Sequence, residues 1–276
     1  MKTLGKIYAG IMYALLYAPL VVMVLYSFNA LKSTSKLSFD YAGGKYSFGY
    51  WYKEVFESGG ALVPLRNSLI LALLTAIIAT LLGTLAAYAL FKLRLRWVKS
   101  TIKSVTNIPM MNPDIVTGIS MMLLFATAFG VLGAGQTGFL TLLISHVTFS
   151  LPYVILSIVP RLRQMDKNLP EAAMDLGCTR VQAFFKVQLP FLSPAILSGM
   201  VMAFTLSLDD YVVSLFTTGA SFETLPLYIF NMARRSVPPS IYAVSTLFLI
   251  LVLGLLILSN VMQNRMEKKQ SENHQN

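Results

Sequence analysis

The sequence is poor in the residues from which most metal centres are built. It has one cysteine, Cys178, and two histidines, His146 and His274. A single cysteine excludes an internal disulfide and a multi-cysteine metal site, and two histidines leave almost nothing for a histidine-based centre. We therefore expect no metal site in this chain.

Motifs for nucleotide hydrolysis and nucleophilic catalysis are also missing. The chain has no G-x-x-x-x-G-K-[ST] phosphate loop, and GGK at residues 43–45 lacks the first glycine. It has no G-x-S-x-G elbow, and no carboxylate pair beside a histidine that indicates a water-exposed catalytic centre. We expect a chain without catalytic residues and without a cofactor of its own, which is not an enzyme.

Charged residues are scarce: they make up 12% of the chain, while 55% is hydrophobic. A soluble domain would carry about 25% charged residues, so the composition indicates an integral membrane protein. Apolar runs of about 18 or more residues can cross a bilayer as helices. Such runs occupy residues 7–28, 68–91, 109–130, 138–160, 194–218 and 241–262. They lack the strict alternation of barrel strands, so we predict an all-α membrane protein with six transmembrane helices.

The positive charges are distributed unevenly around these runs. The net charge is +10, and 15 lysines and arginines fall in segments on the side of the N-terminus, against 7 on the other side. The positive-inside rule then predicts that both termini are cytoplasmic. The charge thus indicates topology rather than nucleic-acid binding. Two long connections result, an external loop at 29–67 and a cytoplasmic loop at 161–193.

The cytoplasmic loop contains LPEAAMDLGCTRVQAFFKVQLPFLSPAI, residues 169–196. Pro170 suits the first turn of a helix, and Glu171 complements the positive end of the helix dipole there. Gly177 is placed to end that helix in a left-handed turn. We predict a short helix over about 169–176, with Ala172 and Ala173 giving a face that a partner can approach closely. The alternative is an amphipathic interfacial helix that links two spans.

The spacing of these residues resembles the EAA motif of permease subunits of ABC importers. The matching positions are Glu171, Ala172, Ala173, Gly177, Val187, Leu189 and Pro190, with valine in place of the usual isoleucine. The resemblance implies a type I importer permease architecture, with one transmembrane permease domain over residues 1–276. It also implies a coupling helix that docks on an ATPase dimer, which binds ATP and Mg. A second homologous permease subunit, an external binding protein and a bacterial inner membrane are implied in the same way.

Three further segments resemble the permease subunits of spermidine/putrescine importers. They are NPDIVTGIS (112–120), SHVTFSLPYV (145–154) and FTLSLDDYVVSLFTTGASFETLPLYIF (204–230). This resemblance implies a subunit that forms half of the pathway of a polyamine importer. Two alternatives stay open: an importer of another small solute or a metal ion, and a secondary transporter that works without ATP.

Asp209 and Asp210 stand side by side in the fifth apolar run. Each aspartate near the centre of a membrane helix costs roughly 2.5–3.5 kcal/mol on insertion scales. We predict that both line the substrate pathway in the outer half of the membrane and contact a cation. The structural alternatives are a helix break wetted from outside, pairing with Arg234 or Arg235, and protonation of one carboxyl group.

Four more residues are candidates for the pathway. His146 lies near the expected depth of the aspartates, but a helix–helix hydrogen bond is the alternative. Asp114 follows Asn112 and Pro113 at the expected cytoplasmic start of the third span, where it is either a helix cap or an exit site. Glu223 is expected to meet the cationic substrate or a basic patch of the delivering protein. Tyr211 is either an aromatic wall residue or a packing residue.

Overall fold

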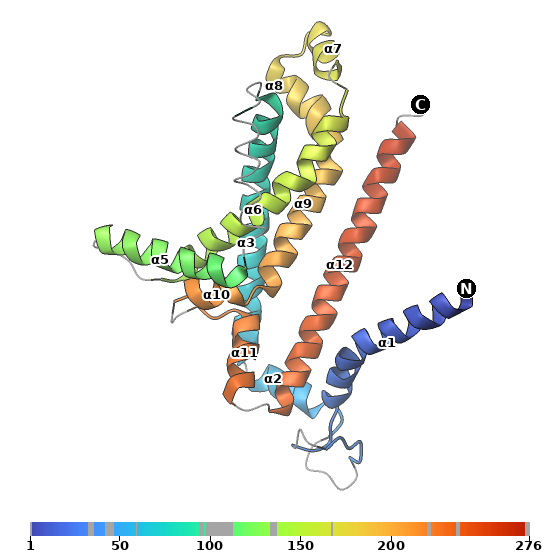
Figure 1. The fold of residues 1–276 in the computed structure, drawn as a ribbon, viewed down its shortest axis with the longest axis vertical. Helices are drawn as coiled ribbons and strands as arrows, with labels where there is room; N and C mark the ends of the chain where they lie inside the picture. The colour runs from blue at the N-terminus through green and yellow to red at the C-terminus, as the bar shows by residue number, and fades with distance from the viewer. Residues whose placement is uncertain are drawn as a thin grey trace. The chain divides into compact units, whose positions relative to one another are not determined.

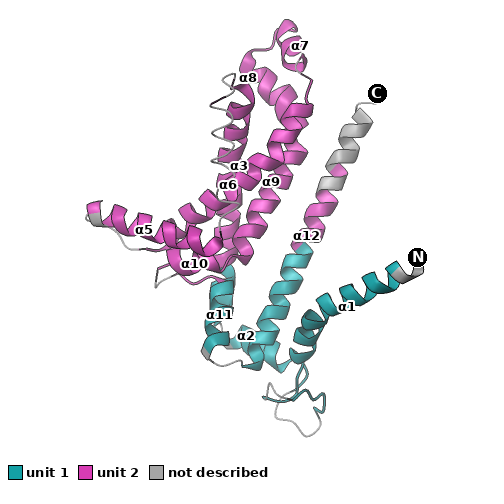
Figure 2. Ribbon diagram, in the orientation of Figure 1, with its two compact units in different colours: residues 1–66, 225–254 teal, residues 67–224, 255–276 magenta. Residues whose placement is uncertain are grey.

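The computed structural model describes residues 2–32, 36–41, 47–58, 60–93, 97, 113–132, 137–166, 168–219, 222–235 and 238–273. Within these ranges the chain is helical and contains no strand. It divides into two compact units, residues 1–66 with 225–254 and residues 67–224 with 255–276 (Figure 2). The helices α3 (Leu62–Lys92) and α12 (Pro239–Asn273) each contribute to both units.

The first unit contains α1 (Lys2–Tyr26), α2 (Tyr50–Ser58), α11 (Leu225–Arg235) and the first part of α12. Trp51 of α2 is buried with Ala243 and Val244 of α12. Its indole Nε1 donates a hydrogen bond of 2.7 Å to the backbone carbonyl of Asn29. The described part of the predicted external loop is thus anchored to the helices of this unit.

The second unit carries the elements that build the candidate site. It contains most of α3, then α5 (Asp114–Leu132), α6 (Phe139–Gln164), α7 (Leu169–Asp175), α8 (Arg180–Ala183), the π-helix η1 (Phe184–Gln188), α9 (Leu189–Asp209), α10 (Val212–Thr217) and the end of α12. Figure 1 shows α6 and α9 side by side, and α5 running across their direction.

Glycine allows α6 to pack closely against both α3 and α9. A Cβ atom on Gly83 of α3 would lie 2.6 Å from Cγ1 of Val154, and one on Gly199 of α9 would lie 3.2 Å from the same atom. Val154 is therefore held between two helices at small-residue contacts, the usual means of close helix approach in a membrane. The surrounding core includes Ile158 and Leu192.

Among the described residues, five helices are long and apolar enough to cross a membrane: Gly5–Tyr26, Leu62–Lys92, Phe139–Gln164, Arg180–Asp209 and Pro239–Met262. They correspond to five of the six predicted spans. The third predicted span begins at residues 109–112, which lie outside the described part of the chain. Its described part is α5, whose apolar stretch Asp114–Phe129 is shorter.

The span predicted over 194–218 is not one continuous helix, and the structural alternative of a helix break at the aspartates is what the structure shows. The helix that contains these residues extends back to Leu189 and ends at Asp209, and α10 follows after a two-residue turn. The break falls at the aspartate pair. Hydropathy does not reveal this break, because the residues on both sides of the turn are equally hydrophobic.

Candidate functional site

The two adjacent aspartates occupy different structural positions. Asp209 is the last residue of α9, whereas the backbone of Asp210 is extended (φ −65°, ψ 126°) and turns the chain toward α10. The Asp210 carboxylate accepts hydrogen bonds from the backbone N–H groups of Val213 (3.2 Å) and Ser214 (2.8 Å). Amides in the first turn of a helix have no partner within that helix, so Asp210 stabilises the start of α10.

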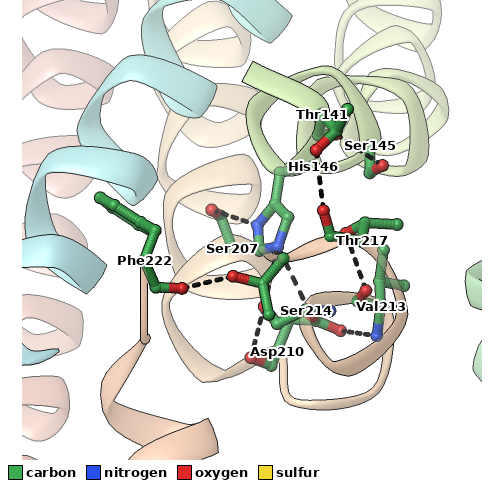
Figure 3. A network of polar contacts seen from close by, with 10 residues as sticks. Thr141, Ser145, His146, Ser207, Asp210, Val213, Ser214, Thr217 and Phe222 are labelled. Atoms are coloured by element: carbon green, nitrogen blue, oxygen red, sulfur yellow. Dashed lines mark hydrogen bonds and ion pairs between the residues drawn. The ribbon is translucent and has the colours of Figure 1, made fainter. Parts of the chain in front are cut away.

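Asp210 is in turn held by a buried histidine from α6 (Figure 3). His146 is fully buried; its Nδ1 lies 2.8 Å from Oγ of Ser207, and its Nε2 lies 3.1 Å from Oγ of Ser214. The same Nε2 lies 3.4 Å from Oδ2 of Asp210, whose side chain is 10% exposed. His146 thus links α6, α9 and α10, which confirms the predicted alternative of a helix–helix hydrogen bond.

A second contact fixes the other end of α10 to α6. The hydroxyl group of Thr141 donates a hydrogen bond of 2.8 Å to the backbone carbonyl of Thr217. The hydroxyl group of Thr218, directly after α10, donates a hydrogen bond to the backbone carbonyl of Phe222. Together with the His146 contacts, these bonds hold the turn and α10 in a defined position against α6 (Figure 3).

The aspartates face a cavity of about 310 Å³. Three carboxyl-bearing residues line it: Asp114 from α5, and Asp209 and Asp210 from the helix break. Its other lining residues are aromatic, apolar or hydroxyl-bearing: Thr117, Phe149, Tyr153, Leu206, Tyr211, Val212 and Val213. Asp209 is exposed, so the carboxylate that is not needed for capping is available to a ligand. Carboxylates beside aromatic faces are complementary to organic cations.

The position of Asp114 corrects a prediction. It was predicted at the cytoplasmic start of the third span, as a helix cap or an exit site, whereas Asp209 and Asp210 were predicted in the outer half of the membrane. The structure places all three in the lining of one cavity because α5 packs against α10, which follows the aspartates. Asp114 is the first residue of α5, and the expected cap, Asn112, lies outside the described residues.

Glu223 does not line this cavity. It follows α10, and its backbone carbonyl accepts a hydrogen bond of 3.0 Å from Nδ2 of Asn67. Its role toward substrate or a delivering protein stays a prediction. Arg234 places its guanidinium group 5.7 Å from the ring centre of Phe230 on its own helix, and the side chain of Arg235 lies outside the described residues. The basic group that pairs with Asp210 is His146.

Phe149 and Tyr153 are site residues that the sequence did not single out. They lie one turn apart on α6 and both line the cavity. The spacing of four residues could have placed them on one face. The face itself could not be chosen, because α6 is apolar on most sides.

The short helix predicted over about 169–176 is confirmed as α7, and it ends in the expected left-handed turn; its role in coupling stays a prediction. Gly177 has φ +89°; its N–H bonds to the carbonyl of Met174 (2.9 Å), and the N–H of Cys178 bonds to that of Ala173 (3.1 Å). These two bonds form a Schellman motif. Glu171 and Ala172 are exposed, whereas Ala173 is buried. Of the two alanines, only Ala172 is therefore on the surface of α7.

Large apolar side chains are exposed next to this helix. Leu176 is 87% exposed, and Val181 and Phe185 are exposed as well. Leu189 and Pro190 are the first two residues of α9, the helix that ends at Asp209. An exposed apolar group around a short polar helix is typical of a surface that binds a partner.

Comparison with known proteins shows the family of the chain. Residues 79–272 match the family of binding-protein-dependent transport system inner membrane components. The chain belongs to this family. It is 37% identical to the spermidine/putrescine transport system permease protein PotC of Haemophilus influenzae, over 92% of this chain and 94% of that protein. It is 40% identical to the putrescine transport system permease protein PotI of Escherichia coli K12, over 86% of this chain and 82% of that protein.

Solved structures show the same fold. A bacterial ABC transporter involved in the import of alginate has a chain that matches with a TM-score of 0.73 and 14% identity, over 95% of both chains. A methionine ABC transporter matches with a TM-score of 0.63, over 76% of this chain and 97% of that one. This member of the binding-protein-dependent transport family thus has the type I importer permease fold. It is a multi-pass inner-membrane subunit that serves transport and is not an enzyme.

Proposed function

We propose that this chain is a permease subunit of an ATP-driven polyamine importer, with spermidine and putrescine as the substrate class. The observation that carries the proposal is the cavity in which Asp114, Asp209 and Asp210 meet Phe149, Tyr153 and Tyr211. The named substrates of the relatives PotC and PotI support the same class.

The chemistry of the cavity suits a linear polyamine. Such a substrate carries ammonium groups separated by methylene chains, so it needs separated anionic contacts and apolar walls between them. Carboxylates from α5 and α9 supply the first, and the aromatic rings of α6 supply the second. A volume of about 310 Å³ falls at the lower end of the roughly 300–1,000 Å³ found for small-molecule sites.

In this proposal, partner subunits supply ATP hydrolysis, the other half of the pathway and delivery of the substrate. In this proposal α7, with Glu171 and Ala172 exposed, docks on an ATPase dimer that binds ATP and Mg. A second homologous permease subunit completes the pathway, and an extracytoplasmic binding protein delivers the polyamine. Both termini and α7 lie on the cytoplasmic side, and the loop 29–67 lies outside.

Uptake by the complete set of subunits tests this function. Cells with all subunits should import labelled spermidine or putrescine, and excess diamine should compete while a neutral diol of equal length should not. Asp114→Asn should weaken uptake without loss of ATPase co-purification, because it removes one of the three carboxylates. Import of a neutral or anionic solute in preference to the amines would reject the polyamine assignment.

A further inference from the structure

The cavity face of α6 and α9 continues toward the end of the bundle that carries α7. On α6, Phe149, Tyr153, Ser157 and Arg161 are spaced four residues apart and therefore lie on one stripe. On α9, Asp209, Leu206, Met202 and Ser198 form the corresponding stripe at spacings of three and four. The two stripes lie side by side because Gly199 brings α9 against Val154 and Ser157 of α6.

A second hollow of about 250 Å³ lies at the far end of these stripes. Ser157, Arg161 and Gln164 line it from α6, and Ser198 lines it from α9, with Pro160 and Pro194 beside them. From Asp209 to Ser198 the helix advances about 16 Å at 1.5 Å per residue. The hollow therefore lies well beyond the three carboxylates on the way toward α7.

The charge of this hollow is opposite to that of the first cavity. The described residues that line it include no carboxylate, and its ionised group is the guanidinium of Arg161. Arg161 is held in place by α9: its Nε donates to the carbonyl of Phe191 (3.4 Å), and its guanidinium lies 4.4 Å from the centre of the Phe191 ring. A fixed positive charge here lowers the local concentration of cations.

We propose that this second hollow is the release vestibule of the pathway, and that Arg161 prevents a cationic substrate from rebinding after it leaves the carboxylates. The inference rests on the proposed polyamine function. A polyamine that reaches the vestibule meets serine and glutamine side chains, which solvate it, and a positive charge that repels it. Import is thus favoured over return because the site near the α7 end binds cations weakly.

Inhibition from the release side tests the role of Arg161. The complete complex is reconstituted in proteoliposomes with ATP and the ATPase inside, and uptake of labelled spermidine is measured against rising unlabelled spermidine inside. In Arg161→Gln, half-inhibition should need about tenfold less internal spermidine, which corresponds to about 1.4 kcal/mol. Arg161→Lys, which keeps the charge, should behave like the parent, and so should Arg163→Gln, two residues further along α6.

Ser198→Asp provides an independent variant, since it adds a carboxylate to the vestibule and leaves Arg161 and Phe191 in place. It should lower the inhibitory internal concentration in the same direction. The role of Arg161 is overturned if an assembled Arg161→Gln complex does not shift that concentration, or if Arg161→Lys shifts it as much as Arg161→Gln. If Arg161→Gln does not assemble, Ser198→Asp decides alone. A parent complex that imports no amine overturns the polyamine function itself, and with it this inference.

Discussion

The different surroundings of Asp209 and Asp210 predict that their neutral replacements will have different consequences. The Asp210 carboxylate accepts two backbone N–H groups and lies 3.4 Å from His146 Nε2. Asparagine keeps one carbonyl oxygen but presents an NH₂ group to the second donor. Hydrogen bonds to charged groups contribute about 1.5–3 kcal/mol, against about 0.5–1.5 kcal/mol for neutral ones. Asp210→Asn should therefore destabilise the turn by about 1–3 kcal/mol.

Asp209→Asn should affect transport instead of stability. The Asp209 side chain is exposed and lines the cavity, and in the proposed function its loss removes an anionic contact of the substrate. A unit charge pair at about 4 Å is worth about 4 kcal/mol at an effective dielectric constant of about 20, and water in the cavity reduces this. We expect a fall of roughly tenfold or more in the apparent affinity for spermidine during uptake.

The two variants are compared by thermal unfolding of the purified complex and by uptake at equal membrane abundance. Asp210→Asn should lower the unfolding midpoint by roughly 2–4 °C for each kcal/mol lost, whereas Asp209→Asn should leave it unchanged. Ser193→Asn, at the opposite end of α9, serves as a control. The assignment is wrong if Asp209→Asn lowers the midpoint as much as Asp210→Asn, or if uptake is indifferent to Asp209→Asn.

Two glycines give further predictions. Gly83→Ala should destabilise the complex by about 1–3 kcal/mol by overpacking, since the new Cβ would lie 2.6 Å from Val154 Cγ1. In thermal unfolding, adding Val154→Ala should restore much of the lost stability. The control is Gly254→Ala, which should be neutral because the new Cβ would have nothing within 4 Å. Gly177→Ala should distort the end of α7, because φ +89° costs a residue with a Cβ about 1–2 kcal/mol. Substrate-stimulated ATPase activity of the complex should fall, while Gly177→Asn should retain more of it; equal activity in all three would contradict a role for this turn in coupling.

Local sequence signals predicted most of the helices. Apolar length predicted the spans, and Pro170 and Gly177 predicted both ends of α7 to within one residue. These features depend on residues that are close in sequence: a helix terminus needs a proline or a glycine at a fixed offset. Hydropathy does not show the break at Asp210, because it averages over a two-residue turn between two apolar helices, and only the aspartate pair itself suggested a break as an alternative.

The composition of the cavity was predicted only in part, because local sequence signals do not specify contacts between helices that are distant in sequence. Asp209, Asp210 and Tyr211 adjoin one another in sequence, so their common location needed no tertiary information. Asp114 joins them because α5 packs against α10, and no local pattern specifies that packing. His146 was singled out because of its expected depth, but its role depends on Ser207 and Ser214, which reach it from other helices.

The helix break explains how one chain accommodates two neighbouring aspartates in a membrane segment. In an unbroken helix the two carboxylates would need compensation on adjacent faces, at a cost of roughly 2.5–3.5 kcal/mol each on insertion scales. Ending α9 between them separates their surroundings. Asp210 finds amide donors and His146 inside the protein, and Asp209 faces the cavity. The buried aspartate thus holds the turn that presents the exposed one, so the position of the carboxylate proposed to bind substrate depends on a network that does not itself need to touch the substrate.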